Sequence, residues 1–360
     1  MSYNSVGRPK FYIDAVMLAR QLGHLNDALN TLTRDKFFLN PVNTTEISIP
    51  IDPNITNYPY ERFIDIHFKN SANNLYGRRY LNSLSYLFIL GHRLKTDNFK
   101  IHAYVRDIDA QRNDDLVDYT FLDSNGWAKF EGSVDKTLNT SRFTFHITGN
   151  DPRGNINTND AYHEPIISST PIGDISFGWS YLMPVSPDLE LTQTFSNESL
   201  KVQTTKGGAT LTNKGWNQPP KWGIYPQWKA SPNDVAYPTR RSWNLKFSFI
   251  SDEKLMPQFF NELDATNNNR GIFERISVST DDGGTPDDDT DDTVLQSFQI
   301  KDNFLTKVYS GTNGFQLPFI FQPDHNVEEY AICRVNQDSV VFTQEAHRVY
   351  GLSLNVEECW

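Results

Sequence analysis

The part of the sequence that most constrains the fold is 242–264, where a hydrophobic period of two changes to a helical period. In its first half, Trp243, Leu245, Phe247 and Phe249 alternate with polar residues. A period of two places these four side chains on one face of a strand, because successive side chains of a strand point to opposite faces. The pattern predicts a half-buried strand whose aromatic face belongs to a protein core.

The second half of this stretch predicts a helix over about 252–264. Ser251 or Asp252 is suited to cap it, because a short polar side chain accepts hydrogen bonds from the first free N–H groups of a helix. Phe259, Phe260 and Leu263 would then form its buried stripe. A strand that leads into a packed helix is therefore expected here.

The C-terminal residues predict several more strands. Leu352 and Leu354 belong to an alternating run over 349–360, so we expect both in the same core. Apolar runs at 318–324 and 330–335 predict two shorter strands before it. The region 241–360 is thus predicted to be a β-sandwich domain with one packed helix.

This layout resembles the β-domain of tubes and hub rings in tailed-phage tails, the distal-tail and minor-tail proteins. The residues that carry the resemblance are 240–249, 317–322 and 349–360. The resemblance implies a structural virion protein that forms a cyclic ring, with three or six copies, and docks neighbouring tail or fibre proteins. It also implies location in the virion tail and no catalytic residues.

Residues 1–40 are predicted to form an N-terminal arm with a short helix that ends at Gly23. The apolar residues at helical spacing are Phe11, Ala15, Leu18 and Leu22. Such an arm packs on its own domain or is lent to a neighbouring subunit, and both alternatives stay open.

From 41 to 190, short alternating apolar runs separated by turn residues predict a first β-sandwich. The apolar strand at 84–94 resembles the galactose-binding-like jelly rolls of phage tail and fibre proteins. His67, His102 and His146 are predicted on the outward faces of their strands, with no partner evident in the sequence. The chain as a whole is therefore expected to be mainly β, with two β-sandwich domains.

The connector 191–240 is rich in proline, glycine and tryptophan, which excludes long regular elements. Exposed aromatic side chains supply much of the energy of protein contacts and of sugar stacking. The candidates are Trp216, Trp222, Tyr225 and Trp228. Three interpretations stay open for them: a subunit contact, a glycan site, or simple cover for the junction between domains.

An aspartate-rich loop is predicted at 279–293. Asp287, Asp289 and Asp291 have the alternate spacing of calcium ligands, but the glycine and glutamate of an EF-hand loop are absent. The sequence therefore offers a calcium site here, while a solvated loop without metal is the plainer interpretation. No other cofactor is expected.

Charge and composition limit the function classes. The net charge of −11 and the lack of a basic stripe argue against a dedicated nucleic-acid surface. The two cysteines are Cys333 and Cys359. We expect both to be small core residues in a reduced compartment, and we expect the chain to be synthesised in a host cytoplasm. No run of apolar residues is long enough for a membrane span, so none is expected.

Motifs for hydrolases, phosphate binding and dinucleotide binding are missing from the sequence. The chain is therefore expected to be a non-enzymatic structural component of a phage tail, hub or baseplate. A carbohydrate-binding adhesin or tail fibre is the alternative, which would bind host glycans. A glycan-active enzyme is a third alternative, because its two carboxylates need not be close in sequence.

Overall fold

The structure is a computed structural model in which part of the chain is described. The described residues are 7–26, 61–71, 74–90, 99–107, 113–121, 127–134, 140–149, 174–189, 192–196, 201–213, 221–222, 225–226, 240–256, 273–281, 293–300 and 302–359.

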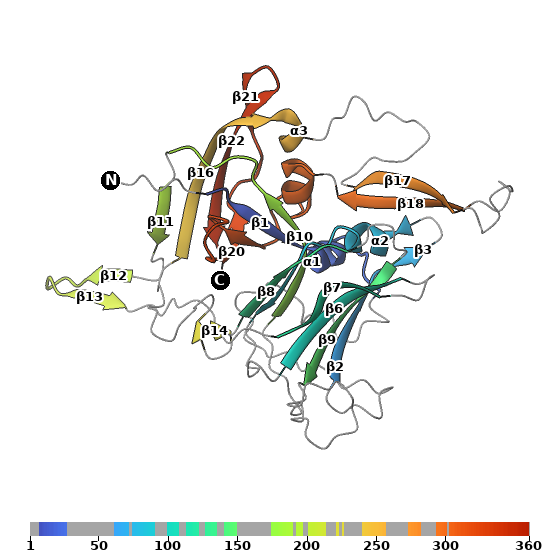
Figure 1. Cartoon of the computed structure of the whole chain (residues 1–360). Coiled ribbons are helices and arrows are strands. Elements are labelled where there is room, and N and C mark those ends of the chain that lie inside the picture. Colours follow the sequence, from blue (N-terminus) through green and yellow to red (C-terminus); the bar gives the residue numbers. More distant parts are fainter. Residues whose placement is uncertain are drawn as a thin grey trace.

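The protein is mainly β, as the sequence predicts, and its largest element is a ten-stranded antiparallel sheet (Figure 1). The order of neighbouring strands is β11 (Thr192–Ser196), β16 (Arg240–Ser251), β22 (Val349–Glu358), β20 (Ala331–Val335), β19 (Phe319–Gln322), β1 (Lys10–Asp14), β10 (Asp174–Leu182), β5 (Tyr86–Leu90) and β8 (Trp127–Glu131). The tenth strand, β21 (Phe342–Ala346), pairs with β22 off this path.

A four-stranded antiparallel sheet packs on one end of the large sheet. Its strands, in order, are β2 (Glu61–His67), β9 (Thr140–Gly149), β6 (Phe99–Asp107) and β7 (Asn113–Phe121). Phe143 of β9 stacks on Phe177 of β10 with 3.9 Å between ring centroids. The inward side chains of both sheets belong to one hydrophobic core, so the two sheets form a sandwich.

The remaining elements are short. The described helices are α1 (Ala15–Gln21), α2 (Tyr76–Leu81), α3 (Asp252–Leu255) and the π-helix η1 (Leu305–Ser310). Four two-stranded hairpins are formed by β3 (Asn70–Ser71) with β4 (Asn74–Leu75), β12 (Lys201–Thr204) with β13 (Thr210–Asn213), β14 (Lys221–Trp222) with β15 (Tyr225–Pro226), and β17 (Phe273–Asp281) with β18 (Thr293–Ile300). Within the described ranges, no helix has the length and apolar character needed to span a bilayer.

The N-terminal arm contributes a strand in the middle of the large sheet. β1 pairs with β10 on one side and with β19 on the other. Phe11, expected on a helix, lies on this strand, and the helix begins only at Ala15, where the Asp14 carboxylate accepts a hydrogen bond from the Met17 N–H. Gly23 adopts a positive φ of 71° just after α1, so the predicted end of the helix is confirmed.

The large sheet thus joins strands from the predicted arm, the first predicted sandwich, the predicted connector and the C-terminal region. One core cluster likewise includes Ile13, Phe143 and Leu354. A division of the chain into two separate sandwich domains stays a prediction.

The predicted core of the C-terminal region is confirmed with one exception. Trp243, Leu245, Phe247, Leu352 and Leu354 are all buried. The prediction for Phe249 is wrong, because its side chain is 73% exposed. The register of β16 against β22 shifts between Phe247 and Ile250, and this bulge turns Ile250 into the core in place of Phe249.

Helix α3 is shorter than the sequence pattern predicts. Ser251 occupies the N-cap position without a side-chain capping bond, and the backbone of Met256 is already extended. The continuous helix over 252–264 is therefore wrong in its extent, and 257–264 lie outside the described residues.

The two cysteines are free, as the sequence predicts. Cys333 is fully buried on β20, and burial raises the pKa of its thiol. Burial also raises the pKa of Cys359, to about 11. Both thiols therefore stay protonated at neutral pH and behave as small core residues.

Candidate functional site

Two of the four predicted aromatic contact residues lie on the strands of a small described hairpin. Trp222 of β14 and Tyr225 of β15 are cross-strand partners in the register of this hairpin. Trp216 and Trp228 lie outside the described residues. The backbone pairing places these two positions opposite each other in the predicted connector, and the aromatic contact site stays a prediction.

The predicted calcium ligands Asp287, Asp289 and Asp291 lie outside the described residues. The flanking strands are described: β17 ends at Asp281 and β18 begins at Thr293. The aspartate-rich segment therefore connects the two strands of a hairpin, and its calcium site stays a prediction.

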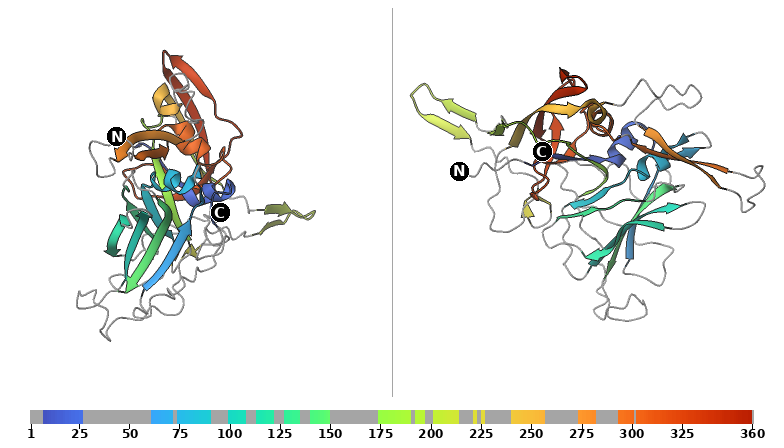
Figure 2. Two further views of the ribbon diagram at one scale, coloured as in Figure 1. Left: turned by 90° about the vertical axis from the view of Figure 1, so that its right-hand side faces the viewer. Right: turned by 45° about the horizontal axis from the view of Figure 1, so that its top comes forward.

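Two hairpins project from opposite sides of the molecule (Figures 1 and 2). The β12–β13 hairpin follows strand β11 in sequence, and its residues 203–211 are all exposed. The β17–β18 hairpin extends on the other side, where β18 contacts α2. The exposed residues 203–211 of the β12–β13 hairpin are accessible to a partner.

Strand β11 forms one edge of the large sheet. Among the described strands it pairs with β16 only, and four of its five residues are exposed. The Phe195 side chain on this strand is 51% exposed. The other exposed large apolar residues on or beside β11, β13, β16 and β21 are Leu189, Leu211, Phe249 and Val341.

The outer face of the four-stranded sheet carries a polar cluster that the sequence did not reveal. His102 was expected to point outward with no evident partner, but its ring is buried and Nε2 lies 2.6 Å from Asp115 Oδ1. The Tyr104 ring lies 4.7 Å from the His102 ring between centroids. Asp118 completes a group of three possible metal ligands whose ligand atoms all lie within 4.8 Å of one another.

The same face continues across β9 to β2. Thr144 donates a hydrogen bond of 2.5 Å to Asp65, and Arg142 lies 3.4 Å from the same carboxylate. Burial raises the pKa of Tyr104 despite its hydrogen bond to Thr144. Burial also lowers the pKa of His67, which favours the neutral imidazole. Polar and aromatic side chains on this face are therefore linked by hydrogen bonds, ion pairs and ring contacts.

A second cluster is enclosed at the centre of the large sheet. Asp14 of β1 and Asp174 of β10 are both buried, and Asp14 acts on Asp174 as a like charge. Burial raises the pKa of Asp14 to about 6, and burial together with Asp14 raises the pKa of Asp174. Asp174 Oδ2 has no hydrogen-bond partner. Burial therefore makes both carboxyl groups harder to ionise, which suits a core better than a charged catalytic site.

An ion-pair network joins β16 to the C-terminal strand. Arg241 binds both oxygens of Glu358, at 3.2 and 3.1 Å, and also pairs with Glu329. Its guanidinium lies 5.2 Å from the Trp243 ring centroid. Burial lowers the pKa of Arg241, but Glu358 more than reverses this and the net shift is upward. The network fastens two neighbouring strands and exposes no reactive group.

Sequence reasoning could have found part of these clusters. The run Asp-Leu-Val-Asp at 115–118 contains the signal, since Leu116 and Val117 are both buried between two exposed acids. The partner His102 lies on the neighbouring strand, and its register with β7 is not readable from one sequence. Asp14 and Asp174 are 160 residues apart, so nothing local connects them.

In comparisons with known proteins, no family model, curated protein or solved structure matches the chain.

Proposed function

We propose that this protein is a non-enzymatic structural component of a tailed-phage virion, in the tail, hub or baseplate. The observation that carries the proposal is the exposed edge strand β11, which continues towards a projecting hairpin. The sequence resemblance of 240–249, 317–322 and 349–360 to tail-ring proteins supports the phage assignment. In this proposal the chain is made in the host cytoplasm and ends in the virion tail.

Strand β11 offers a means of assembly. An edge strand presents unpaired N–H and C=O groups, which pair readily with a strand of another chain. Phe195 adds an apolar anchor on the same strand. Repetition of one such contact around an axis closes a cyclic ring, and ring size then depends on the angle of the contact.

The projecting hairpins would reach neighbouring subunits or adjacent tail and fibre proteins. Leu211 on β13 is exposed, and an apolar residue on a projecting arm gains stability when a partner covers it. The aromatic pair Trp222 and Tyr225 lies in the connector that follows this arm. These residues would enlarge the subunit contact.

A carbohydrate-binding adhesin is the second candidate, favoured by the Trp222–Tyr225 pairing. Tryptophan and tyrosine rings supply the flat apolar faces on which sugar rings stack. A glycan array probed with the intact chain separates the two functions. Glycan binding that Trp222→Ala abolishes would favour the adhesin.

The assembly proposal is tested by light scattering of the purified chain, compared with the variant Phe195→Glu. We expect the intact chain to form a ring-sized oligomer and the variant to lose it. Val327→Glu is the matched control, because Val327 is also half exposed but lies in the connection between β19 and β20 and not on β11. Monomers at every concentration, or an oligomer unaffected by Phe195→Glu, would contradict assembly through this edge.

The phage assignment is tested separately by antibody labelling of purified phage particles under the electron microscope. Label confined to the tail or its tip is the expected result. Label on thin fibres would favour the adhesin, and particles without any label would contradict the virion assignment.

A further inference from the structure

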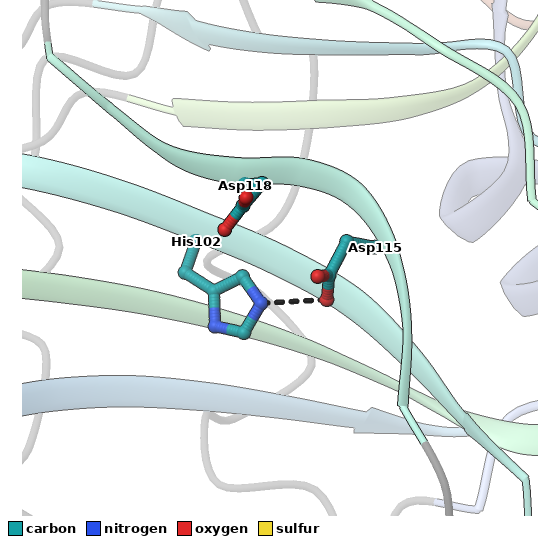
Figure 3. Close-up of side chains that lie close together, drawn as sticks. All are labelled: His102, Asp115 and Asp118. Atoms are coloured by element: carbon teal, nitrogen blue, oxygen red, sulfur yellow. Dashed lines mark hydrogen bonds and ion pairs between the residues drawn. The ribbon is translucent and has the colours of Figure 1, made fainter.

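One nitrogen and two carboxylates converge on the outer face of the four-stranded sheet (Figure 3). His102 comes from β6, and Asp115 and Asp118 come from β7. We propose that these three residues bind a divalent transition-metal ion of the zinc class. This site is separate from the predicted calcium loop and from the edge strand used for assembly.

The local geometry of β7 is what brings the two carboxylates together. On a regular strand, residues three apart point to opposite faces, so Asp115 and Asp118 would diverge. The pairing of β6 with β7 shifts here: Ala103 faces Val117, whereas Tyr104 faces Asp115. Leu116 is therefore an extra residue, and the bulge turns both acids towards His102.

Burial holds the His102 imidazole in a fixed position for metal binding. The His102 side chain is only 8% exposed, whereas that of Asp115 is 40% exposed. The Tyr104 ring lies against His102, and the His146 ring meets it edge-on with centroids 6.1 Å apart. A ligand held in place by its neighbours loses little side-chain entropy when the metal arrives. The two more exposed carboxylates are then the adjustable part of the site.

The distances need a small adjustment that these carboxylates allow. Metal bonds to nitrogen and oxygen are about 2.0–2.2 Å long, so neighbouring ligand atoms lie about 3.0–3.6 Å apart. Here His102 Nε2 and Asp115 Oδ1 are closer, at 2.6 Å, and the full set of ligand atoms spans up to 4.8 Å. Rotation of the exposed Asp118 carboxylate inward, with a slight opening of the His102–Asp115 contact, brings all three into range.

The ligand types decide the class of metal. Calcium and magnesium prefer oxygen ligands alone, whereas imidazole suits zinc and its transition-metal neighbours. Three protein ligands leave at least one position of a tetrahedral ion for water or for a side chain of a partner. Zinc should therefore bind here more tightly than calcium.

The test is a calorimetric titration of the intact chain with zinc, supported by the visible absorption of cobalt(II) as a spectroscopic probe. We expect one site whose affinity falls about tenfold or more in Asp118→Asn and in His102→Gln, since loss even of a supporting residue costs a metal site 10–100-fold. Asp338→Asn is the control, because it makes the same chemical change at an exposed aspartate elsewhere. Its titration should match that of the unmodified chain.

Other histidines and the cysteines provide an alternative source of zinc binding, and the variants distinguish it. Zinc binding that Asp118→Asn and His102→Gln leave unchanged would overturn the site, as would the absence of zinc binding by the intact chain. Calcium bound more tightly than zinc at this cluster would overturn the class of metal. Far-ultraviolet circular dichroism of each variant checks that the fold is retained.

Discussion

Arg241 is a buried charged residue whose guanidinium pairs with Glu358 and Glu329. Replacement by Met leaves the buried Glu358 carboxylate without its counter-ion. Removing one partner of a buried ion pair costs about 3–5 kcal/mol. We therefore expect Arg241→Met to lower the free energy of unfolding by about this amount, measured by urea denaturation.

The double variant Arg241→Met with Glu358→Leu tests the cause. If the cost comes from an uncompensated charge, the double variant is more stable than Arg241→Met alone. If the double variant loses as much free energy of unfolding as the two single variants together, then packing, and not charge, explains the loss.

Asp14 predicts a pH dependence of stability. Its pKa rises from an ordinary 3.8 to about 6 in the fold, so the folded chain binds a proton that the unfolded chain has lost between these values. Stability is then fully present below pH 4 and falls as the pH rises through 6. A shift of about two pKa units corresponds to roughly 3 kcal/mol.

Asp14→Asn should remove this loss, because asparagine keeps an oxygen for the Met17 N–H but does not ionise. We expect the melting temperature of the variant to depend less on pH between 4 and 7 than that of the unmodified chain. Asp338→Asn serves as the exposed control. An unchanged pH profile in Asp14→Asn would show that Asp14 ionises normally.

At this scale, the sequence predicts burial better than it predicts partners. The alternation around Trp243 and Leu354 identifies the core residues correctly except Phe249, because burial follows the local period of a strand up to the β-bulge. The contact between His102 and Asp115 depends on a bulge between two strands, which no local pattern specifies.

Strand β16 shows how one bulge divides two similar residues between core and solvent. Phe247 is 1% exposed and Phe249 is 73% exposed, although both belong to the same alternating run. Truncation of a buried phenylalanine costs about 3–5 kcal/mol, whereas exposed substitutions usually change stability by less than about 0.5 kcal/mol. Phe247→Ala should therefore unfold at much lower urea than Phe249→Ala.

Each of these variants is the control for the other, since the chemical change is identical. Equal losses of stability would place Phe249 in the core and would contradict the proposed effect of the bulge.

The elements themselves were predictable to different degrees. The strands at 242–249 and 349–358 follow directly from their alternation. The predicted helix after β16 is too long. The helical pattern of the sequence continues beyond Met256, whereas the backbone is already extended at that residue. Phe11 fits a helical spacing with Ala15, yet pairing with β10 and β19 makes it part of a strand, so tertiary contacts override the local pattern.

For the whole molecule, the interleaving of the chain was the least predictable property. The large sheet takes strands from four regions that look like separate units in the sequence. Composition and turn density indicate a mainly β protein, but they carry no information on which strands are neighbours. That information lies in contacts between distant residues, such as Tyr12 with Ile320.

The position of β1 predicts unequal effects of two deletions. Deletion of residues 1–14 removes a strand with partners on both sides, and we expect the chain to lose cooperative thermal unfolding. Replacement of 201–213 by a short glycine-serine linker removes only a projecting hairpin, so the melting temperature should change by a few degrees at most. Scanning calorimetry measures both, and a stable first variant would contradict the central place of β1.

The same position affects how the chain is made on a ribosome. Tyr12 pairs with Ile320, so its partner is synthesised 308 residues later. At about 5–20 residues per second, β1 waits roughly 15–60 s with one side open. During this time a β-rich nascent chain is exposed to mispairing and to chaperones, and pairing over such a separation is slow in itself. Slow translation or chaperone depletion should therefore lower the yield of this protein more than that of proteins whose strands pair with near neighbours.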